Sequence, residues 1–293
     1  MPSSAPPREA VPVIAQEFRV DDPCALSVHV PGARTRLRPG PSDERVEVEV
    51  SVLGCPPDEA EAILDRMKVG THQMKDTVRV YSDSDRSDAE WWRWVRTLDV
   101  EIHVDLLLPS YVDAEIRAPG GEVDIADLEG DIDVKVMGGP CHAENLAGTL
   151  NIRAESSDVS IEQFSGDELV GRVAVGSLSL EDVTADAVTV RSVAAPLSLS
   201  SITGPTTVTT RSAPVELQDL SGPCTARVKA GHLTFSGAPD EDVVLRVVGT
   251  PLDAILPASH AADLHMTGPQ LSLDDRFAFE GERTDQEIEG VLN

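Results

Sequence analysis

The residues with the clearest chemical potential are basic, and they recur at one point of a repeated pattern. Arg or Lys stands six residues before the first apolar residue of a recurring phrase in seven of nine repeats, and a histidine stands there in an eighth. The positions are Arg117, Lys135, Arg153, Arg172, Arg191, Arg227, Arg246 and His265, with Thr209 interrupting the series. Because guanidinium groups capture carboxylate and phosphate in a bidentate fashion, this column predicts an anion- or partner-binding stripe.

The same column also has a purely structural interpretation. Arg stems can lie over a flat β face and cover apolar surface, and acids in nearby turns such as Glu162, Glu181 and Asp182 can offset the repulsion between them. According to the binding hypothesis, the stripe instead binds an extended anion, an acidic partner segment or the acidic face of another copy. The sequence leaves both interpretations open.

All three tryptophans lie within four residues, in the segment DAEWWRWVR. Trp91, Trp92 and Trp94 are candidates for contact with a partner, since aromatic side chains often anchor interfaces. They are equally suited to plug the open end of an apolar core. Both alternatives remain at this stage.

Other reactive residue types form no recognisable site. The four cysteines lack the spacing of a zinc site, and Cys141 and Cys224 fall at apolar, inward positions of the repeat. His260 and His265 are five residues apart, which does not suit one helical face. We therefore expect no metal, no cofactor and no catalytic residue.

These positions belong to a regular repeat. Taking the first apolar residue of each phrase as an anchor, successive anchors are 18 or 19 residues apart; they are Val123, Cys141, Val159, Leu178, Leu197, Val215, Leu233, Leu252 and Leu271. Each unit holds two short stretches of period-2 alternation, the pattern of β-strands, separated by turn residues. Two strands cannot bury a core alone, but stacked units can. The sequence thus predicts an all-β fold, a parallel β-solenoid of about nine coils.

Two related repeat architectures do not fit this spacing. A hexapeptide helix needs an aliphatic residue every six positions, whereas the apolar spacing within a unit is 2, 7, 2 and 3. Calcium-binding nonapeptide repeats need GGxGxD runs, which the chain lacks.

The pattern divides the chain into three parts. We expect a disordered tail at 1–14, a β-rich capping region at 15–110 and the solenoid at 111–293. Within the cap, strand-like runs occupy 25–30, 45–52, 77–82 and 98–108, and PPDEAEAILDRM predicts one helix. Such a cap would protect the first coil from edge-to-edge aggregation.

The net charge of the chain limits the classes of partner that it can bind. A formal net charge of −27 argues against general nucleic-acid binding. It suits a protein kept soluble in high salt, where charges are screened over short distances. No apolar run reaches the length of a membrane span and no signal peptide is evident, which predicts a cytoplasmic location, with association with the cell envelope as the alternative.

The segments VEIHVDLLLPS and YVDAEIRAPGGEVDIADLEGDIDV carry a resemblance to a known family. They resemble the bacterial putative-adhesin family, a domain of unknown function with repeated phrases of this type, over roughly residues 15–293. That resemblance implies a β-solenoid without catalytic activity, and it brings no site residues.

Together these observations predict a non-enzymatic, adhesin-like binding or scaffold protein whose partner is an unidentified protein or anionic polymer. A self-assembling structural subunit, and hence a homo-oligomer, is the alternative. A carbohydrate-active β-helix enzyme fits less well, because its chemistry needs clustered carboxylates on one face, whereas the acids here fall at turns.

Overall fold

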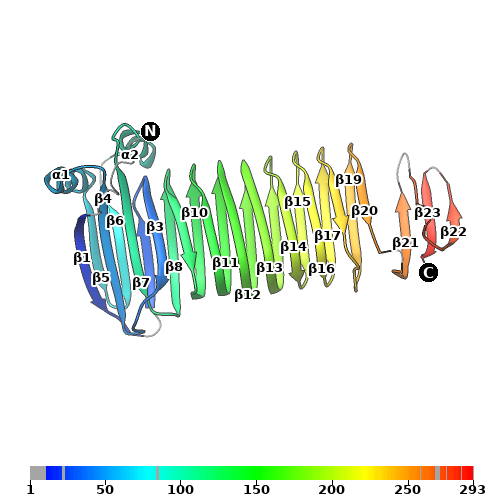
Figure 1. The fold of residues 1–293 in the computed structure, drawn as a ribbon, viewed down its shortest axis with the longest axis horizontal. Helices are drawn as coiled ribbons and strands as arrows, with labels where there is room; N and C mark the ends of the chain where they lie inside the picture. The colour runs from blue at the N-terminus through cyan, green and yellow to red at the C-terminus, as the bar shows by residue number, and fades with distance from the viewer. Residues whose placement is uncertain are drawn as a thin grey trace, which may run out of the picture.

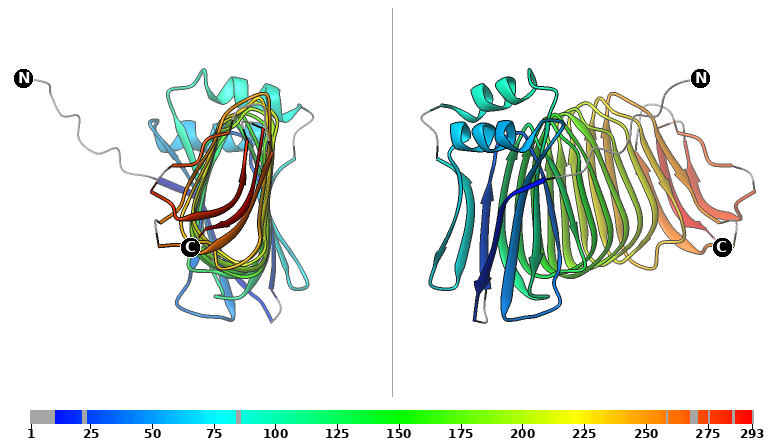
Figure 2. Two further views of the ribbon diagram at one scale, coloured as in Figure 1. Left: turned by 90° about the vertical axis from the view of Figure 1, so that its right-hand side faces the viewer. Right: turned by 60° about the vertical axis from the view of Figure 1, so that its left-hand side comes forward.

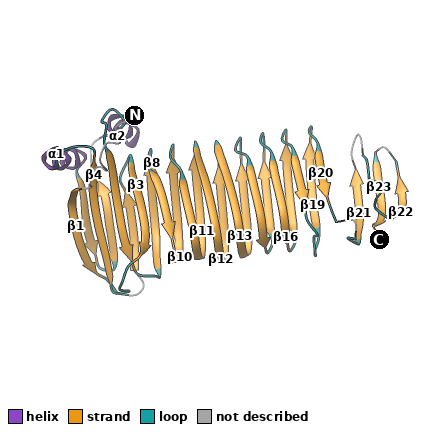
Figure 3. Ribbon diagram, viewed as in Figure 1, coloured by secondary structure: helices purple, strands orange, loops and turns teal. Residues whose placement is uncertain are grey.

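Stacked coils of β-strand make up most of the molecule (Figure 1). The computed structural model describes residues 11–21, 24–83, 86–257, 259–267, 271–274, 276–284 and 286–292. Strands account for 66% and helices for 7%, and the solenoid has about seven turns, with all its long strands side by side (Figure 3). The predicted parallel β-solenoid is confirmed, but nine coils is too many.

Each coil contributes one strand to each of two long faces, so the coils nest as flattened ovals when viewed along the axis (Figure 2). The face with the basic column, here the stripe face, is built from β8 (Val112–Pro119), β10 (Glu129–Met137), the second halves of β11 (Cys141–Glu155), β12 (Ser157–Val173) and β13 (Gly176–Ser192), then β15 (Thr206–Thr210), β17 (Cys224–Lys229) and β19 (Val243–Val248). The opposite face, here the anchor face, holds β9 (Glu122–Ala126), the first halves of β11 to β13, β14 (Leu197–Thr203), β16 (Val215–Ser221), β18 (Leu233–Ser236) and β20 (Leu252–Ile255).

Alternation along each strand sends apolar side chains inward and the rest outward. In β10, Ile132, Val134 and Val136 are buried while Lys135 between them is exposed. The corner after each anchor-face strand uses a left-handed backbone residue four positions beyond the anchor; these are Asp127, Asn145, Gln163, Asp182, Ser201 and Asp219, with φ between 50° and 60°. Short polar side chains tolerate this conformation better than branched apolar ones. The repeat therefore specifies corners as well as faces.

The N-terminal region adds coils out of chain order. β2 (Cys24–His29) pairs in parallel with β8, and β3 (Ala33–Pro39) with β9, so one extra coil precedes the first predicted one. β6 (Thr77–Ser82) and β7 (Glu101–Leu108) then stack on β2 and β3. Antiparallel strands β1 (Val11–Arg19), β4 (Arg45–Leu53) and β5 (Val69–Met74) close this end. The cap therefore continues both faces before ending them.

Two helices lie beside this end. α1 (Pro57–Met67) is the predicted helix, with Pro at its start and acidic residues in the first turn. α2 (Asp88–Val95) is an additional helix that carries the tryptophans. Its N-terminus is a capping box between Ser87 and Glu90, whose pKa is lowered by hydrogen bonds from the Ser87 backbone and hydroxyl.

The C-terminal segment departs from the prediction. β21 (Ala262–Thr267), β23 (Glu287–Leu292) and β22 (Phe279–Arg283) form a separate antiparallel sheet. The ninth anchor, Leu271, lies outside any described strand, so the ninth coil is wrong. Alternation alone fits an antiparallel hairpin as well as a coil, and the EIEGVL segment supplies β21 with an antiparallel partner. Of the predicted tail, 1–10 lies outside the described residues, and β1 begins at Val11.

Candidate functional site: the stripe face

The basic column is a continuous stripe on the stripe face. Strand pairing places its members in one row, in the order Arg117, Lys135, Arg153, Arg172, Arg191, Thr209, Arg227, Arg246. His265 does not join this row, because it lies in β21 opposite Glu289 of β23. The sequence therefore identified seven of the eight basic positions as neighbours, and the structure places the eighth elsewhere.

Three of the four cations in the first part of the stripe have hydrogen-bond or ion-pair partners within the molecule. Arg117 Nε donates to Glu115 at 3.0 Å, and Arg153 forms an ion pair of 3.3 Å with Asp133 of the preceding coil. Arg172 donates to Asn151 at 3.0 Å. Lys135 has no such partner among the described residues, but it shares β10 with Asp133. Two of these four charges, those of Arg117 and Arg153, are accordingly neutralised by acids of the same face.

Charges in the second part of the stripe have no partners in the described structure. Arg191, Arg227 and Arg246 are exposed, and their side chains form no hydrogen bond or ion pair with any described residue. Two further exposed cations stand two residues beyond the stripe position: Lys229 ends β17, and Arg211 lies in the bend directly after β15. Neither forms a hydrogen bond or ion pair with a described residue. We call these five residues the late basic cluster. Arg211 stands in the coil that Thr209 interrupts, so it supplies the charge missing from that position.

Acidic residues are absent from the part of this face between Ala187 and Lys229, whereas Asp240, Glu241 and Asp242 directly precede β19, which carries Arg246. Between residues 187 and 229 the chain contains only two acids, Glu216 and Asp219, and both belong to β16 on the anchor face. The outward neighbours of the late basic cluster are instead Thr189, Thr207 and Thr225, which pair in one row. The late basic cluster thus lies on a flat face of hydroxyl, proline and alanine side chains.

A shallow hollow of about 310 Å³ connects the two parts of the stripe. It lies between the stripe and the adjacent corner, and small side chains make its floor; its lining residues are Arg153, Ala154, Glu155, Arg172, Val173, Ala174, Arg191, Ser192 and Val193. At its edge the Val193 side chain is 52% exposed. Three arginines and one acid, Glu155, thus line the hollow together with small and apolar residues.

The tryptophans lie over the first coils. Trp91 is only 3% exposed and meets Trp94 edge to face, with ring centroids 5.1 Å apart. Trp92 covers the glycine corners, because a Cβ added at Gly120 would lie 1.7 Å from its ring. An arginine sits over each ring at 4.7–5.2 Å. This arrangement fits the plug, and burial removes Trp91 from contact with any partner.

The cysteines sit in a low-reactivity setting. Burial raises the pKa of Cys141 to about 12 and that of Cys224 to about 11. For Cys24, burial and then Asp76 raise the pKa to about 11. Since the thiolate is the nucleophile, these thiols are poorly suited to covalent catalysis or metal binding at neutral pH.

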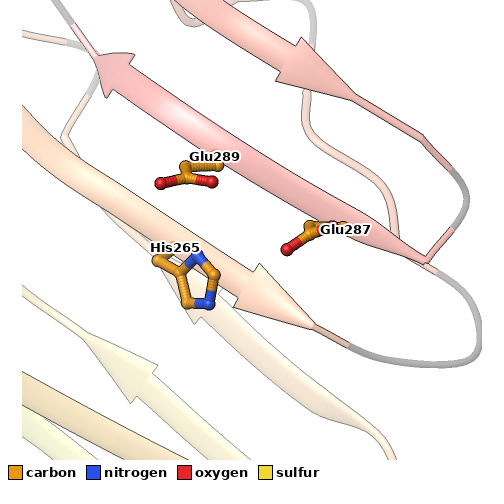
Figure 4. A group of neighbouring side chains, drawn as sticks. All are labelled: His265, Glu287 and Glu289. Carbon is orange, nitrogen blue, oxygen red and sulfur yellow. The ribbon is translucent and has the colours of Figure 1, made fainter.

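A group of potential metal ligands lies in the C-terminal sheet. His265 of β21 faces Glu287 and Glu289 of β23, and their ligand atoms lie within 4.8 Å of one another (Figure 4). One imidazole and two carboxylates are donors that divalent transition metals accept. All three side chains are exposed, and no buried polar group beside them points to an ion. This group could not be identified from the sequence, because the strand pairing that assembles it was not predicted.

Among the described residues, no helix is long and apolar enough to cross a membrane.

Comparison with known proteins returns structural matches alone. No family model and no curated protein matches the chain. The crystal structure of a putative adhesin from Bacteroides fragilis NCTC 9343 aligns over 83% of this chain and 96% of its own, at 15% identity and a TM-score of 0.36. A putative adhesin from Parabacteroides merdae ATCC 43184 aligns over 83% and 95%, at 12% identity and a TM-score of 0.44. Both neighbours are described as putative adhesins, the term used for the family that the sequence resembles.

Proposed function

We propose that this chain is a non-enzymatic binding or scaffold protein whose late basic cluster holds an extended anionic partner. One observation carries the proposal. In a chain with a net charge of −27, five exposed cations lie on or directly after four consecutive strands of one face, and none of them forms an ion pair with a described acid. The earlier coils show that this fold readily places acids beside such cations, as Asp133 does for Arg153.

The neighbouring cations of the late basic cluster repel one another, and a bound anion would remove this repulsion. Like charges in adjacent strands, ~4.8 Å apart, repel by roughly 0.9 kcal/mol per pair in bulk water. A partner with negative charges spaced along the solenoid axis replaces repulsion by several charge-assisted contacts at once. Arginine suits this task because its planar fork binds carboxylate or phosphate in two places.

The proposed role excludes catalysis. On the stripe face, Glu115 and Asp133 are engaged in ion pairs with Arg117 and Arg153. The buried cysteines are held as thiols. These features support a binding face rather than an active site.

The cellular setting of this role stays a prediction. Cytoplasmic location and a high-salt source remain the preferred expectations from sequence. The word adhesin in the descriptions of the two structural neighbours favours the alternative, a role at the cell envelope. Either setting is compatible with an anion-binding face.

Titration with fluorescent poly-L-glutamate, at about 0.15 M salt, tests the proposal. The double variant Arg191→Glu/Arg227→Glu should weaken binding at least about tenfold, or 1.4 kcal/mol, with an unchanged melting temperature. Arg19→Glu changes charge in the same direction on β1, far from the face, and should bind like the wild type. Equal affinity of the double variant and the wild type would show that the late basic cluster is not the site.

A further inference from the structure

The stripe face is electrically bipolar. Its outward positions on β8 and β10 include five acids, Asp113, Glu115, Glu129, Asp131 and Asp133, against two bases. Its outward positions from Ala187 in β13 to Lys229 in β17 include four bases and no acid. The acids stand near the beginnings of their strands, and the bases stand near the ends of theirs. Opposite charges thus occupy diagonally opposed corners of one flat face.

A surface with this property is complementary to itself. An in-plane two-fold axis, perpendicular to the line joining the acidic and basic corners, turns a second copy face down and exchanges the two corners. Each basic corner then lies over the acidic corner of the other copy. A two-fold interface is isologous, so one favourable contact is obtained twice.

We infer that the anionic partner of the late basic cluster is a second copy of this chain, docked face to face through the acidic corner formed by Asp113, Glu115, Asp131 and Asp133. This inference rests on the proposed function, since it uses the same cluster, and it adds the source of the anion. It also unites the binding and self-assembly alternatives, because binding and assembly become one interaction.

The acidic corner has capacity for the contact. Asp131 has no side-chain partner among the described residues. Glu115 and Asp133 are about half exposed, with side-chain exposures of 50% and 40%. A carboxylate has about four acceptor sites, so each can keep its own arginine and accept another. Asp113 already receives the backbone N–H of Asp131 at 3.0 Å, which fixes its orientation.

The area of the face is sufficient for a dimer. Four outward columns about 7 Å apart on eight strands about 4.8 Å apart span roughly 27 by 38 Å. That is about 1,000 Å² per copy, whereas a stable interface of standard size needs about 800 Å². The β-sheet gives a flat surface on which both corners can be reached together.

The salt concentration determines whether the repulsion between two copies of the acidic chain prevents face-to-face docking. Two copies of a chain with charge −27 repel one another at long range. At about 0.15 M salt the screening length is about 8 Å, so distant charges contribute little while contacting pairs persist. Dimerisation should therefore weaken at very low salt, which is the reverse of what simple attraction between two oppositely charged partners would show.

A charge-swap experiment tests the inference. Sedimentation velocity of the full chain, from about 1 to 100 μM at about 0.15 M salt, should show a dimer. Variant one, Arg191→Glu/Arg227→Glu, introduces two acids into the basic corner, and variant two, Glu115→Arg/Asp131→Arg, introduces two bases into the acidic corner. Each variant alone should be monomeric, with its dimer dissociation constant raised at least tenfold. An equimolar mixture should form the heterodimer, because one of its two contacts is the wild-type contact and in the other the introduced glutamates face the introduced arginines.

The outcomes separate this inference from the proposed function. A wild type that stays monomeric at about 100 μM, a single variant that dimerises like the wild type, or a mixture that stays monomeric would each overturn the second-copy partner. Poly-L-glutamate binding by variant two, which keeps the late basic cluster intact, reports on the anion site alone. Rescue in the mixture also excludes misfolding as the cause of either variant's behaviour.

Discussion

The early and late coils of the stripe face carry the same basic column, yet their surroundings differ. On β8 and β11 the arginines face acids of their own or the preceding strand, and Trp92 covers the adjacent corner. On β13, β15 and β17 the neighbouring positions are threonines, and the cations have no described partner. The comparison teaches that the repeat determines where a side chain points. The residue types in the neighbouring columns determine whether its charge is paired within the molecule or is available to a partner.

The largest expected effect is a loss of stability on truncating core side chains, compared between the early strand β8 and the late strand β19. Ile116 on β8 is fully buried, and Leu245, in the same inward column on β19, is only partly buried. Ile116→Ala should lower the free energy of unfolding by about 3–4 kcal/mol, and Leu245→Ala by about 1 kcal/mol. Urea denaturation followed by circular dichroism measures both. Equal losses would mean that the last coil is as tightly packed as the first.

Two corner glycines give the next effect. Gly120 and Gly249 have φ of +72° and +80°, so alanine is strained at both. At Gly120 a Cβ would also displace Trp92, whereas at Gly249 nothing described lies within 4 Å. We expect losses of about 3 and about 1 kcal/mol respectively in chemical denaturation. Tryptophan fluorescence should change for Gly120→Ala alone. An unchanged spectrum would contradict the covering role of Trp92.

An acid placed in the late coils should make them resemble the early ones. Asp133 pairs with Arg153, twenty positions later, and Thr207 stands twenty positions before Arg227. Thr207→Asp should therefore pair with Arg227 and weaken poly-L-glutamate binding by about three- to tenfold, as double-mutant coupling of surface charges allows. Thr207→Asn is the matched neutral control. If Thr207→Asp weakens binding as much in an Arg227→Ala background as in the wild type, the loss of affinity comes from net charge rather than from pairing with Arg227.

Filling the interruption of the stripe should give the smallest effect. Thr209→Arg would complete the stripe between Arg191 and Arg227 and should raise affinity for poly-L-glutamate about two- to threefold, or roughly 0.5 kcal/mol. Unfolding free energy should stay within about 0.5 kcal/mol, since the site is at the surface. Isothermal titration measures the gain. Weaker binding would show that Arg211 already saturates this coil.

Much of the solenoid follows from the sequence, because each inward dyad and each basic position repeats at a nearly constant interval. The predicted row from Arg117 to Arg246 was correct for this reason. Charge pairing was harder to predict. Arg153 takes its acid from the preceding coil, a relation that inspection of its own strand does not show. Arg211 and Lys229 were missed because they fall outside the most regular column, although period-2 alternation places them on the same face.

Other differences have topological causes. The coil of β2 and β3 was not predicted, because β4 to β7 intervene in the chain before its neighbours β8 and β9 appear. His265 satisfied the spacing of the stripe but pairs with Glu289, since alternation does not distinguish parallel from antiparallel partners. Helix α2 is short, yet the Ser87 and Glu90 capping box was a readable signal of its start.

The out-of-order coil has a consequence for how the chain folds. Leu26 must find Ala114, far along the chain, whereas each later strand meets a neighbour only one repeat away, as Lys135 meets Arg153. Closing the long loop is the entropically demanding step, and adding short loops afterwards is fast. Folding should therefore wait until the cap and first coils have been synthesised, and then proceed in one direction toward the C-terminus. The late basic cluster would be among the last surfaces to form, so incompletely folded chains would lack it.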